Sequence, residues 1–210
     1  MIDHLVYASA DLPTASARIA DLLGVAPTPG GNHVGHGTYN ELLSLGDTTY
    51  LEIIGPDPAQ PEPAGGRPFG IDQLTAPALV AWCVRPLRPL REVVAAARAV
   101  GADFGDAAPM SRRRPDGVLL EWSLTFPQLD GPFGCALPFL IDWGESAHPT
   151  DSLPQGVRLL GLDITHPNPE SLRPVLDVIG LANECTVHAG ERPALSARIA
   201  TSRGDVILSS

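Results

Sequence analysis

Two side chains capable of acid–base chemistry lie within apolar, strand-like runs of this chain. Glu52 is the single charged residue in "TTYLEIIG", and His4 lies in the N-terminal run "IDHLVYAS". A carboxylate that is buried without a partner costs several kcal/mol, so Glu52 requires either a structural partner or a function. The structural explanation is a nearby Arg or a backbone donor. The functional explanation is a general base, since burial raises the pKa of a carboxylate toward neutral pH.

Further polar and aromatic residues could line a binding cleft around this pair. Asn40 begins a strand-like stretch and could be either a turn residue or a polar anchor. Arg112–Arg114 precede a Pro-Asp-Gly turn, and we expect Arg114 to enter the cleft if one of them does. Trp82 and Trp122 are either core aromatics or apolar walls of a pocket. Three histidines stand next to turn signals and are expected on the surface, namely His148, His166 and His188.

The strand-like runs would position these residues on defined faces. Alternate residues of a strand point to opposite faces. Glu52 therefore shares a face with Tyr50 and Ile54, and we expect this face to line the cleft. Leu51, which alternates with them, is expected to pack under a helix, and the same parity places His4 toward the cleft and Leu5 toward the helix.

One pattern of elements recurs three times along the chain. An apolar strand is followed by a Pro-marked start, an amphipathic helix, and a stop at Gly24, Gly101 or Gly180. Further strands and turns follow each helix, so each unit is predicted to be βαβββ. The predicted fold class is α+β with three such modules, residues 1–57, 77–146 and 157–210, separated by Pro/Gly-rich linkers.

A four-stranded curved sheet with one helix leaves its other face uncovered, so modules one and two are expected to face each other across a cleft. The third module then has no mate in its own chain. We therefore expect a homodimer in which two third modules cover one another. The alternative is a monomer in which module three packs against the outside of the first two.

Composition excludes several classes of function. The 210 residues carry a formal charge of -10, which disfavours nucleic acid and anionic membrane surfaces as partners. All 14 basic residues are Arg, so chemistry that requires a lysine amine is excluded. The three cysteines show no paired spacing, and the chain has neither a long apolar run nor a signal-like start. A cytoplasmic protein that binds a small molecule is expected.

Several stretches of the chain resemble the vicinal oxygen chelate superfamily, which includes glyoxalase I, extradiol dioxygenases and bleomycin-resistance proteins. The strand-one His in "IDHLVYASADL" and the strand-four Glu in "YLEIIGPDP" carry this resemblance. The phrases "HVGHGTYNELLSLGDTTYLEIIGPDP", "SRRRPDGVLLEW" and "LPFLIDWG" resemble its glyoxalase-like branch more narrowly. The resemblance implies paired βαβββ modules around a small-molecule cleft, and it identifies the fold more specifically than the reaction.

The resemblance also implies a divalent metal, Zn, Ni, Fe or Mn, held by His4 and Glu52. In module two the matching positions are occupied by Trp82 and Ile141, so the ligand set is incomplete. His33 or His36 could supply a third ligand.

Two functions follow from the resemblance. The first is a lyase or isomerase that acts next to a carbonyl, with Glu52 as base and His4 orienting it or binding the metal. Asn40 and an Arg would then hold the substrate oxygens. The alternative is a non-catalytic protein that binds or sequesters a small molecule, as bleomycin-resistance proteins do.

Overall fold

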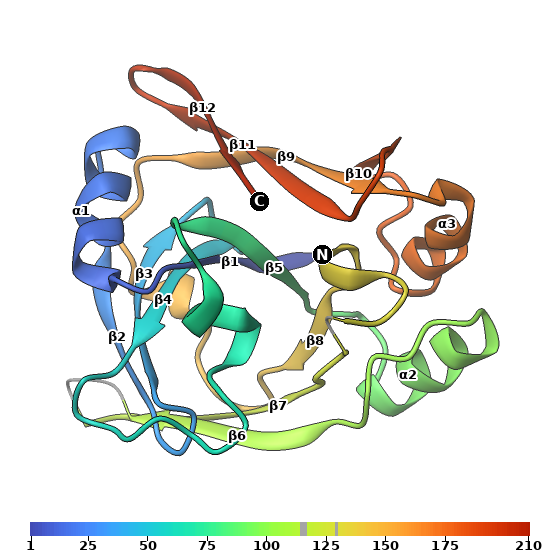
Figure 1. Cartoon of the computed structure of the whole chain (residues 1–210), viewed down its shortest axis with the longest axis horizontal. Coiled ribbons are helices and arrows are strands. Elements are labelled where there is room, and N and C mark those ends of the chain that lie inside the picture. Colours follow the sequence, from blue (N-terminus) through green and yellow to red (C-terminus); the bar gives the residue numbers. More distant parts are fainter. Residues whose placement is uncertain (114–116, 129) are drawn as a thin grey trace.

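Three consecutive stretches of the chain each form a strand, a helix and three further strands (Figure 1). This order is seen in a computed structural model that describes residues 1–113, 117–128 and 130–210. The predicted α+β fold of repeated βαβββ modules is confirmed. The first module contains β1 (Ile2–Ala8), α1 (Leu12–Leu23), β2 (Thr28–His33), β3 (Thr38–Ser44) and β4 (Tyr50–Pro56). The second contains β5 (Ala78–Val84), α2 (Leu90–Ala99), β6 (Ala108–Arg113), β7 (Leu119–Leu124) and β8 (Phe139–Asp142). The third contains β9 (Arg158–His166), α3 (Pro169–Val178), β10 (Cys185–Ala189), β11 (Ala194–Thr201) and β12 (Gly204–Ser209).

The helix ends follow from local sequence signals. Asp11 caps α1, because its carboxylate accepts the backbone N–H of Thr14 at 3.1 Å. Gly24 ends this helix in the left-handed region, with φ of 74°, where a residue without Cβ is least strained. Asn168 stands at the corresponding position before α3, but its side chain makes no capping hydrogen bond among the described residues. Its backbone carbonyl accepts from the Ser171 hydroxyl instead.

The first two modules share one curled sheet. Its strand order is β2-β3-β4-β1-β5-β8-β7-β6, and β2 lies close to β6, so the sheet is nearly closed. The two modules are joined by the antiparallel pair of β1 and β5. Within the modules, β1 pairs in parallel with β4, and β5 pairs in parallel with β8. The concave face of this sheet therefore receives side chains from both modules.

The two faces of the sheet bury different sets of residues. Leu5 and Leu51 belong to the core on the helix side, together with the apolar residues of α1 and α2. Val6, Tyr50 and Ile54 belong to a second cluster on the concave side, which also contains residues of β7 and β8. The parity predicted for β4 is therefore confirmed, as is that of Leu5 on β1. Ile2, which regular alternation would place with His4, joins the helix-side core because β1 is irregular between these two residues.

The third module forms a separate four-stranded sheet, in the order β10-β9-β11-β12. This sheet covers the outside of the curled sheet (Figure 1), and both β11 and β12 contact β5. Its inner apolar side chains join the helix-side core, namely Leu162, Ile164, Leu195, Ala197, Ile199 and Leu208. The helix-side face of module three is thus covered within the chain. Its opposite face, for which the homodimer was expected, is exposed, and Ile207 on that face is 65% exposed. The homodimer stays a prediction.

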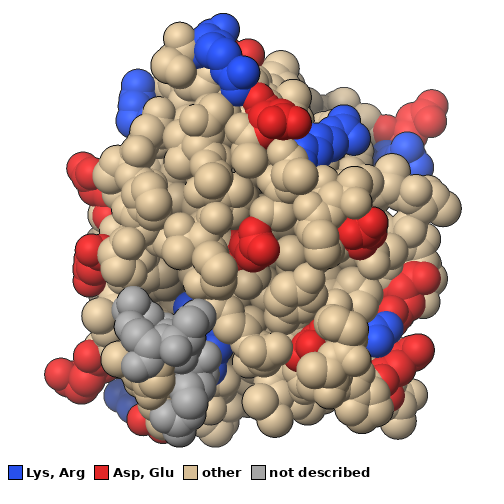
Figure 2. All heavy atoms as spheres, turned by 90° about the vertical axis from the view of Figure 1, so that its left-hand side faces the viewer, with Lys and Arg blue, Asp and Glu red and all other residues tan. Residues whose placement is uncertain are grey.

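On the face over α1, acidic and basic side chains are scattered over a largely uncharged surface (Figure 2). Within the part of the chain that the structure describes, no helix is long and apolar enough to cross a membrane.

Candidate functional site

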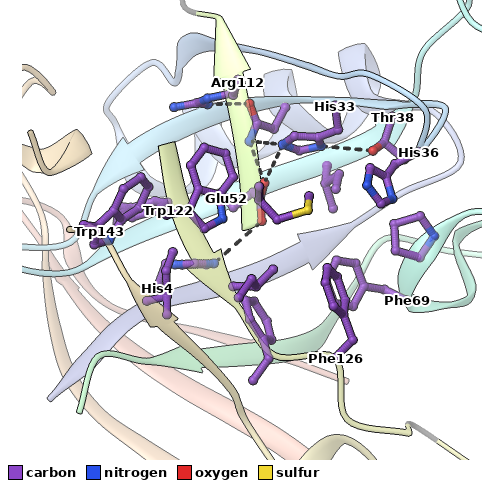
Figure 3. A pocket seen from close by; sticks show the side chains of 18 residues that line it. His4, His33, His36, Thr38, Glu52, Phe69, Arg112, Trp122, Phe126 and Trp143 are labelled. Carbon is purple, nitrogen blue, oxygen red and sulfur yellow. Dashed lines mark hydrogen bonds and ion pairs between the residues drawn. The ribbon is translucent and has the colours of Figure 1, made fainter. Parts of the chain in front are cut away.

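The concave face of the curled sheet encloses a cavity of about 640 Å³, counted out to its mouth (Figure 3). Its walls are mostly aromatic and aliphatic, and its polar side chains converge on Glu52. Such an apolar cavity with a few convergent polar groups is typical of small-molecule sites. The lining residues are His4, His33, His36, Thr38, Asn40, Tyr50, Glu52, Ile54, Pro68, Phe69, Met110, Arg112, Trp122, Leu124, Phe126, Phe139, Ile141 and Trp143.

Glu52 stands on β4 and is 7% exposed. Its Oε1 accepts a hydrogen bond from Nδ2 of Asn40 at 2.5 Å. Its Oε2 lies 3.9 Å from Nε2 of His4, and Oε1 lies 3.7 Å from Nε2 of His33, both beyond hydrogen-bonding distance. The carboxylate in the middle of this strand is therefore held through one oxygen by a neutral amide.

The Asn40 amide is oriented by an arginine from the second module. Arg112 on β6 is 5% exposed and donates from Nη1 to Oδ1 of Asn40 at 2.9 Å. A guanidinium has no acceptor, so the amide oxygen must face Arg112 and the amide nitrogen must face Glu52. A Cβ on Gly30 would lie 2.1 Å from this oxygen and 2.5 Å from Nη1. A glycine at position 30 is therefore what allows Asn40 and Arg112 to meet.

His33 is held as a neutral acceptor beside the same amide. Its Nδ1 lies 3.0 Å from Oγ1 of Thr38, and its Nε2 lies 3.2 Å from Nδ2 of Asn40. Since the amide nitrogen donates, Nε2 carries the lone pair. Burial, opposed by the charge of Glu52 and assisted by that of Arg112, lowers the pKa of His33 to about 4.

We expect His33 to make the stability of the protein depend on pH between 6.5 and 4. In this range the unfolded chain binds a proton at His33 and the folded chain does not, so the stability present above pH 6.5 is lost as the pH falls toward 4. With the folded pKa at about 4, the loss is about 3 kcal/mol. Urea unfolding at several pH values, with EDTA present, measures it. In a plot of the free energy of unfolding against pH, His33→Gln should remove this decrease between pH 6.5 and 4. If the plots of the two proteins run parallel, His33 is not the group responsible for the pH dependence.

His4 is paired with its sequence neighbour Asp3 because β1 is irregular there. In the β1–β5 ladder Ile2 is opposite Val84 and His4 is opposite Cys83, so Asp3 is an extra residue in the strand. Such a bulge redirects a side chain. Nδ1 of His4 lies 2.7 Å from Oδ1 of Asp3, which is fully buried. Sequence reasoning missed Asp3 because regular alternation places neighbouring residues on opposite faces.

Asp3 is the centre of a buried hydrogen-bond cluster. Its Oδ2 accepts from Nε1 of Trp143 and lies near Nε2 of His148, both at 3.1 Å. Arg85 Nε lies 3.7 Å away. Burial by itself would raise the pKa of Asp3, but the hydrogen bonds from His148 and His4 outweigh it, and this pKa lies well below its usual value.

An ionised Asp3 fixes the tautomer of a neutral His4. The Asp3 carboxylate can only accept, so Nδ1 of His4 carries a proton, and in the neutral ring Nε2 turns its lone pair toward the cavity. The ring is held in place by stacking on Tyr50, with ring centroids 4.6 Å apart. The cavity therefore contains two acceptors from adjacent strands, Nε2 of His4 and Oε2 of Glu52.

The surface prediction for two histidines is wrong. The His148 side chain is 10% exposed, and its Nε2–H donates to the Asp3 carboxylate, which can only accept. His166 is 4% exposed and contacts backbone oxygens of Pro132 and Asn168. A turn signal marks the backbone but does not decide whether the loop folds back onto the protein. His188 is exposed as predicted.

The aromatic predictions divide between the two faces of the sheet. Trp122 on β7 lines the cavity, as expected for an apolar wall. Trp82 does not. Trp82 on β5 lies opposite Leu5 of β1, so its side chain points to the helix-side core. There its Nε1 donates to the carbonyl of Ala136 at 3.3 Å. The prediction for Trp82 as a binding residue is thus corrected.

The predicted arginine, Arg114, lies outside the described residues. Arg112, two residues before it, enters the site instead. Sequence reasoning also missed Phe69, which packs on Phe139 at a ring distance of 5.8 Å. Phe69 has a φ of 61°, which is rare for a bulky residue and brings its ring to the mouth of the cavity.

Within the described ranges, one group of three potential metal ligands includes His4 of the cavity. Single ligand atoms of Asp3, His4 and Cys83 lie within 4.8 Å of one another. Asp3 already accepts hydrogen bonds at both oxygens. Burial raises the pKa of the Cys83 thiol well above its usual value, so the neutral thiol is favoured over the thiolate that metals bind.

A model of the glyoxalase-like domain family matches residues 2–179. A search of curated proteins finds no match. The crystal structure of a hypothetical protein from Staphylococcus aureus is similar at a TM-score of 0.65 with 15% identity, over 99% of this chain and 84% of that chain. Methylmalonyl-CoA epimerase from Mycobacterium tuberculosis matches at a TM-score of 0.40 with 17% identity, over 67% of this chain and 84% of that chain. A Q60A variant of the Streptomyces coelicolor methylmalonyl-CoA epimerase, in complex with 2-nitronate-propionyl-CoA, matches at a TM-score of 0.46 with 18% identity, over 67% of this chain and 94% of that chain.

Proposed function

Because the chain belongs to the glyoxalase-like domain family of the vicinal oxygen chelate superfamily, we propose that its cavity binds a small α-hydroxy carbonyl compound and isomerises it. Glu52 removes the proton from the carbon next to the carbonyl. The observation that carries this proposal is the position of the carboxylate. Oε1 is fixed by Asn40, whereas Oε2 faces the cavity and accepts no hydrogen bond from the described residues.

The proposed reaction uses two bases with different tasks. Glu52 takes the proton from carbon, and the electrons of the broken C–H bond move onto the carbonyl oxygen. His4, with its Nε2 lone pair toward the cavity, moves the hydroxyl proton between the two substrate oxygens. Return of the proton from Glu52 to the neighbouring carbon completes the isomerisation. A substrate with a leaving group on the adjacent carbon would instead undergo elimination, which is a lyase reaction.

The neighbours of Glu52 support this role. Asn40 holds the carboxylate and is itself locked by Arg112, so the base cannot rotate away from the substrate. Both contacts come from rigid strands rather than loops. Held in this way, the base and the substrate carbon can meet in a reactive geometry.

The donor set does not fit the divalent metal that the family resemblance implies at His4 and Glu52. A catalytic metal site of this kind needs about three protein ligands. His33 is the nearest third candidate, but the Asn40 N–H groups point at both Nε2 of His33 and Oε1 of Glu52. The residues that module two contributes to the cavity include no histidine, cysteine or carboxylate, and their one sulfur is the Met110 thioether, a soft donor that suits copper(I) better than these metals.

We therefore expect the purified protein to contain well under one equivalent of zinc, nickel, iron or manganese. Elemental analysis by mass spectrometry measures this directly. Adding EDTA should also leave the reaction rate and the unfolding temperature unchanged. A stoichiometric metal whose removal by EDTA abolishes activity would contradict this expectation. It would show that a metal ion replaces the Asn40 amide as the partner of Glu52 and His33.

The proposed activity is tested by hydrogen exchange from carbon. We expect the protein to accelerate the exchange of the CH₂ protons of 2-hydroxyacetophenone into D₂O, followed by proton NMR, with a rate that saturates with substrate. The phenyl ring of this probe suits the aromatic walls, and a parallel experiment with hydroxyacetone tests whether the ring is needed.

A binding protein is the second candidate, and the aromatic lining favours it. In that case the probe binds, as judged by quenching of tryptophan fluorescence, and exchange is no faster than in buffer. That pair of results would remove the catalytic proposal and leave the sequestering function.

A further inference from the structure

The indole N–H of Trp122, which lines the cavity, has no hydrogen-bond acceptor among the described residues. The chain has three tryptophans. The indole N–H of Trp82 donates to the carbonyl of Ala136, and that of Trp143 donates to Asp3. The Nε1 atom of Trp122 is buried and finds no acceptor among the described residues. Leaving such a donor unsatisfied costs about 1–3 kcal/mol, so native proteins rarely do it without a reason.

This donor belongs to a ring that is held firmly at the cavity. Trp122 stands on β7 opposite Met110 of β6, and both side chains line the cavity. The ring packs against Trp143 at a centroid distance of 5.2 Å, and Trp143 is anchored to Asp3. Trp122 and Glu52 therefore reach the same cavity from different modules (Figure 3).

We propose that the indole N–H of Trp122 donates a hydrogen bond to the substrate carbonyl oxygen and stabilises the negative charge that forms there when Glu52 takes the proton. This inference rests on the proposed function. In that step one negative charge leaves the Glu52 carboxylate and appears on the substrate oxygen. Trp122 is a donor that cannot accept, so it favours the charged oxygen over the neutral carbonyl.

The N–H donors of Asn40 and His4 beside the base already have partners. Both N–H bonds of the Asn40 amide point at Glu52 and His33, and the Nδ1–H of His4 points at Asp3. A donor fixed before the substrate arrives needs no reorganisation during the reaction, and the apolar walls strengthen its effect. The Trp122 N–H would thus stabilise the negative charge on the substrate oxygen, which is a task that a metal ion performs in other sites.

The test uses 4-nitrophenolate, a planar anion whose oxygen mimics the charged oxygen of the intermediate. Its absorbance and its quenching of tryptophan fluorescence report binding. We expect Glu52→Gln to bind it at least about ten times more tightly than the wild type, because removing the carboxylate charge mimics the state after proton transfer. In the indole region of a ¹⁵N NMR spectrum, the Trp122 signal should move downfield on binding.

In the Glu52→Gln background, Trp122→Phe should weaken phenolate binding by roughly 10- to 100-fold, as expected for loss of a hydrogen bond to a charged group. Replacing Trp122 by 3-benzothienylalanine keeps the shape of the double ring and removes only the N–H, so it should cause a similar loss. Tyr50→Phe serves as the comparison, since the Tyr50 side chain also lines the cavity.

Each outcome bears on a different claim. If Glu52→Gln binds the phenolate no better than the wild type, the proposed base is wrong and this inference fails with it. If Glu52→Gln binds the phenolate tightly, and both Trp122 replacements in that background bind it just as tightly as Glu52→Gln alone, only the role of Trp122 is overturned. If Tyr50→Phe weakens phenolate binding and the Trp122 replacements do not, the hydrogen bond to the phenolate oxygen comes from the Tyr50 hydroxyl, and the inference is overturned.

Discussion

Glu52→Gln is expected to lower the rate of carbon-bound hydrogen exchange by about 10²- to 10⁴-fold, which is the usual contribution of a general base. The glutamine is nearly isosteric, and its carbonyl can still accept from Nδ2 of Asn40. The anchored half of the side chain therefore keeps its partner, and only the ability to take a proton is lost. Exchange of 2-hydroxyacetophenone in D₂O measures the rate, and circular dichroism verifies the fold.

Glu121→Gln provides the matched control for this experiment. Glu121 precedes Trp122 on β7, and its side chain is exposed. Removing this charge changes the net charge of the protein by the same amount without touching the cavity. We expect its exchange rate to stay within a factor of two of the wild type, as expected of a surface substitution. Equal rates in both variants would show that the effect of Glu52 is not that of a base.

Asp3→Asn should have the largest effect on stability, a loss of about 3–5 kcal/mol in the free energy of unfolding. Three N–H donors converge on the Asp3 carboxylate, from His4, Trp143 and His148. An asparagine presents an NH₂ group to at least one of them, so two donors would face each other in a buried site. The negative charge that balances the nearby Arg85 is lost as well.

Urea unfolding at pH 7 measures this loss, with Asp205→Asn as the control. Asp205 lies on the exposed edge strand β12, and we expect that change to stay within about 0.5 kcal/mol. A free energy of unfolding for Asp3→Asn close to that of the wild type would show that the cluster around Asp3 is not needed for folding.

The sequence by itself determined the fold class and the faces of the two central strands. The recurring Pro-to-Gly helices and the strands between them define βαβββ units, because caps, turns and periodicity act between residues close in the chain. The parity of β1 and β4 placed His4 and Glu52 on the concave face for the same reason. A period of two is set by backbone geometry and does not depend on the rest of the protein.

Only the tertiary structure decided which residues complete the site. Asp3 reaches His4 through a bulge that exists only where β1 pairs with β5. Arg112 enters the cavity because β6 approaches β2 when the curled sheet nearly closes. Trp82 points away because its register opposite Leu5 fixes its face. Strand register, bulges and the docking of the third module all depend on contacts between residues far apart in sequence, so local patterns could not determine them.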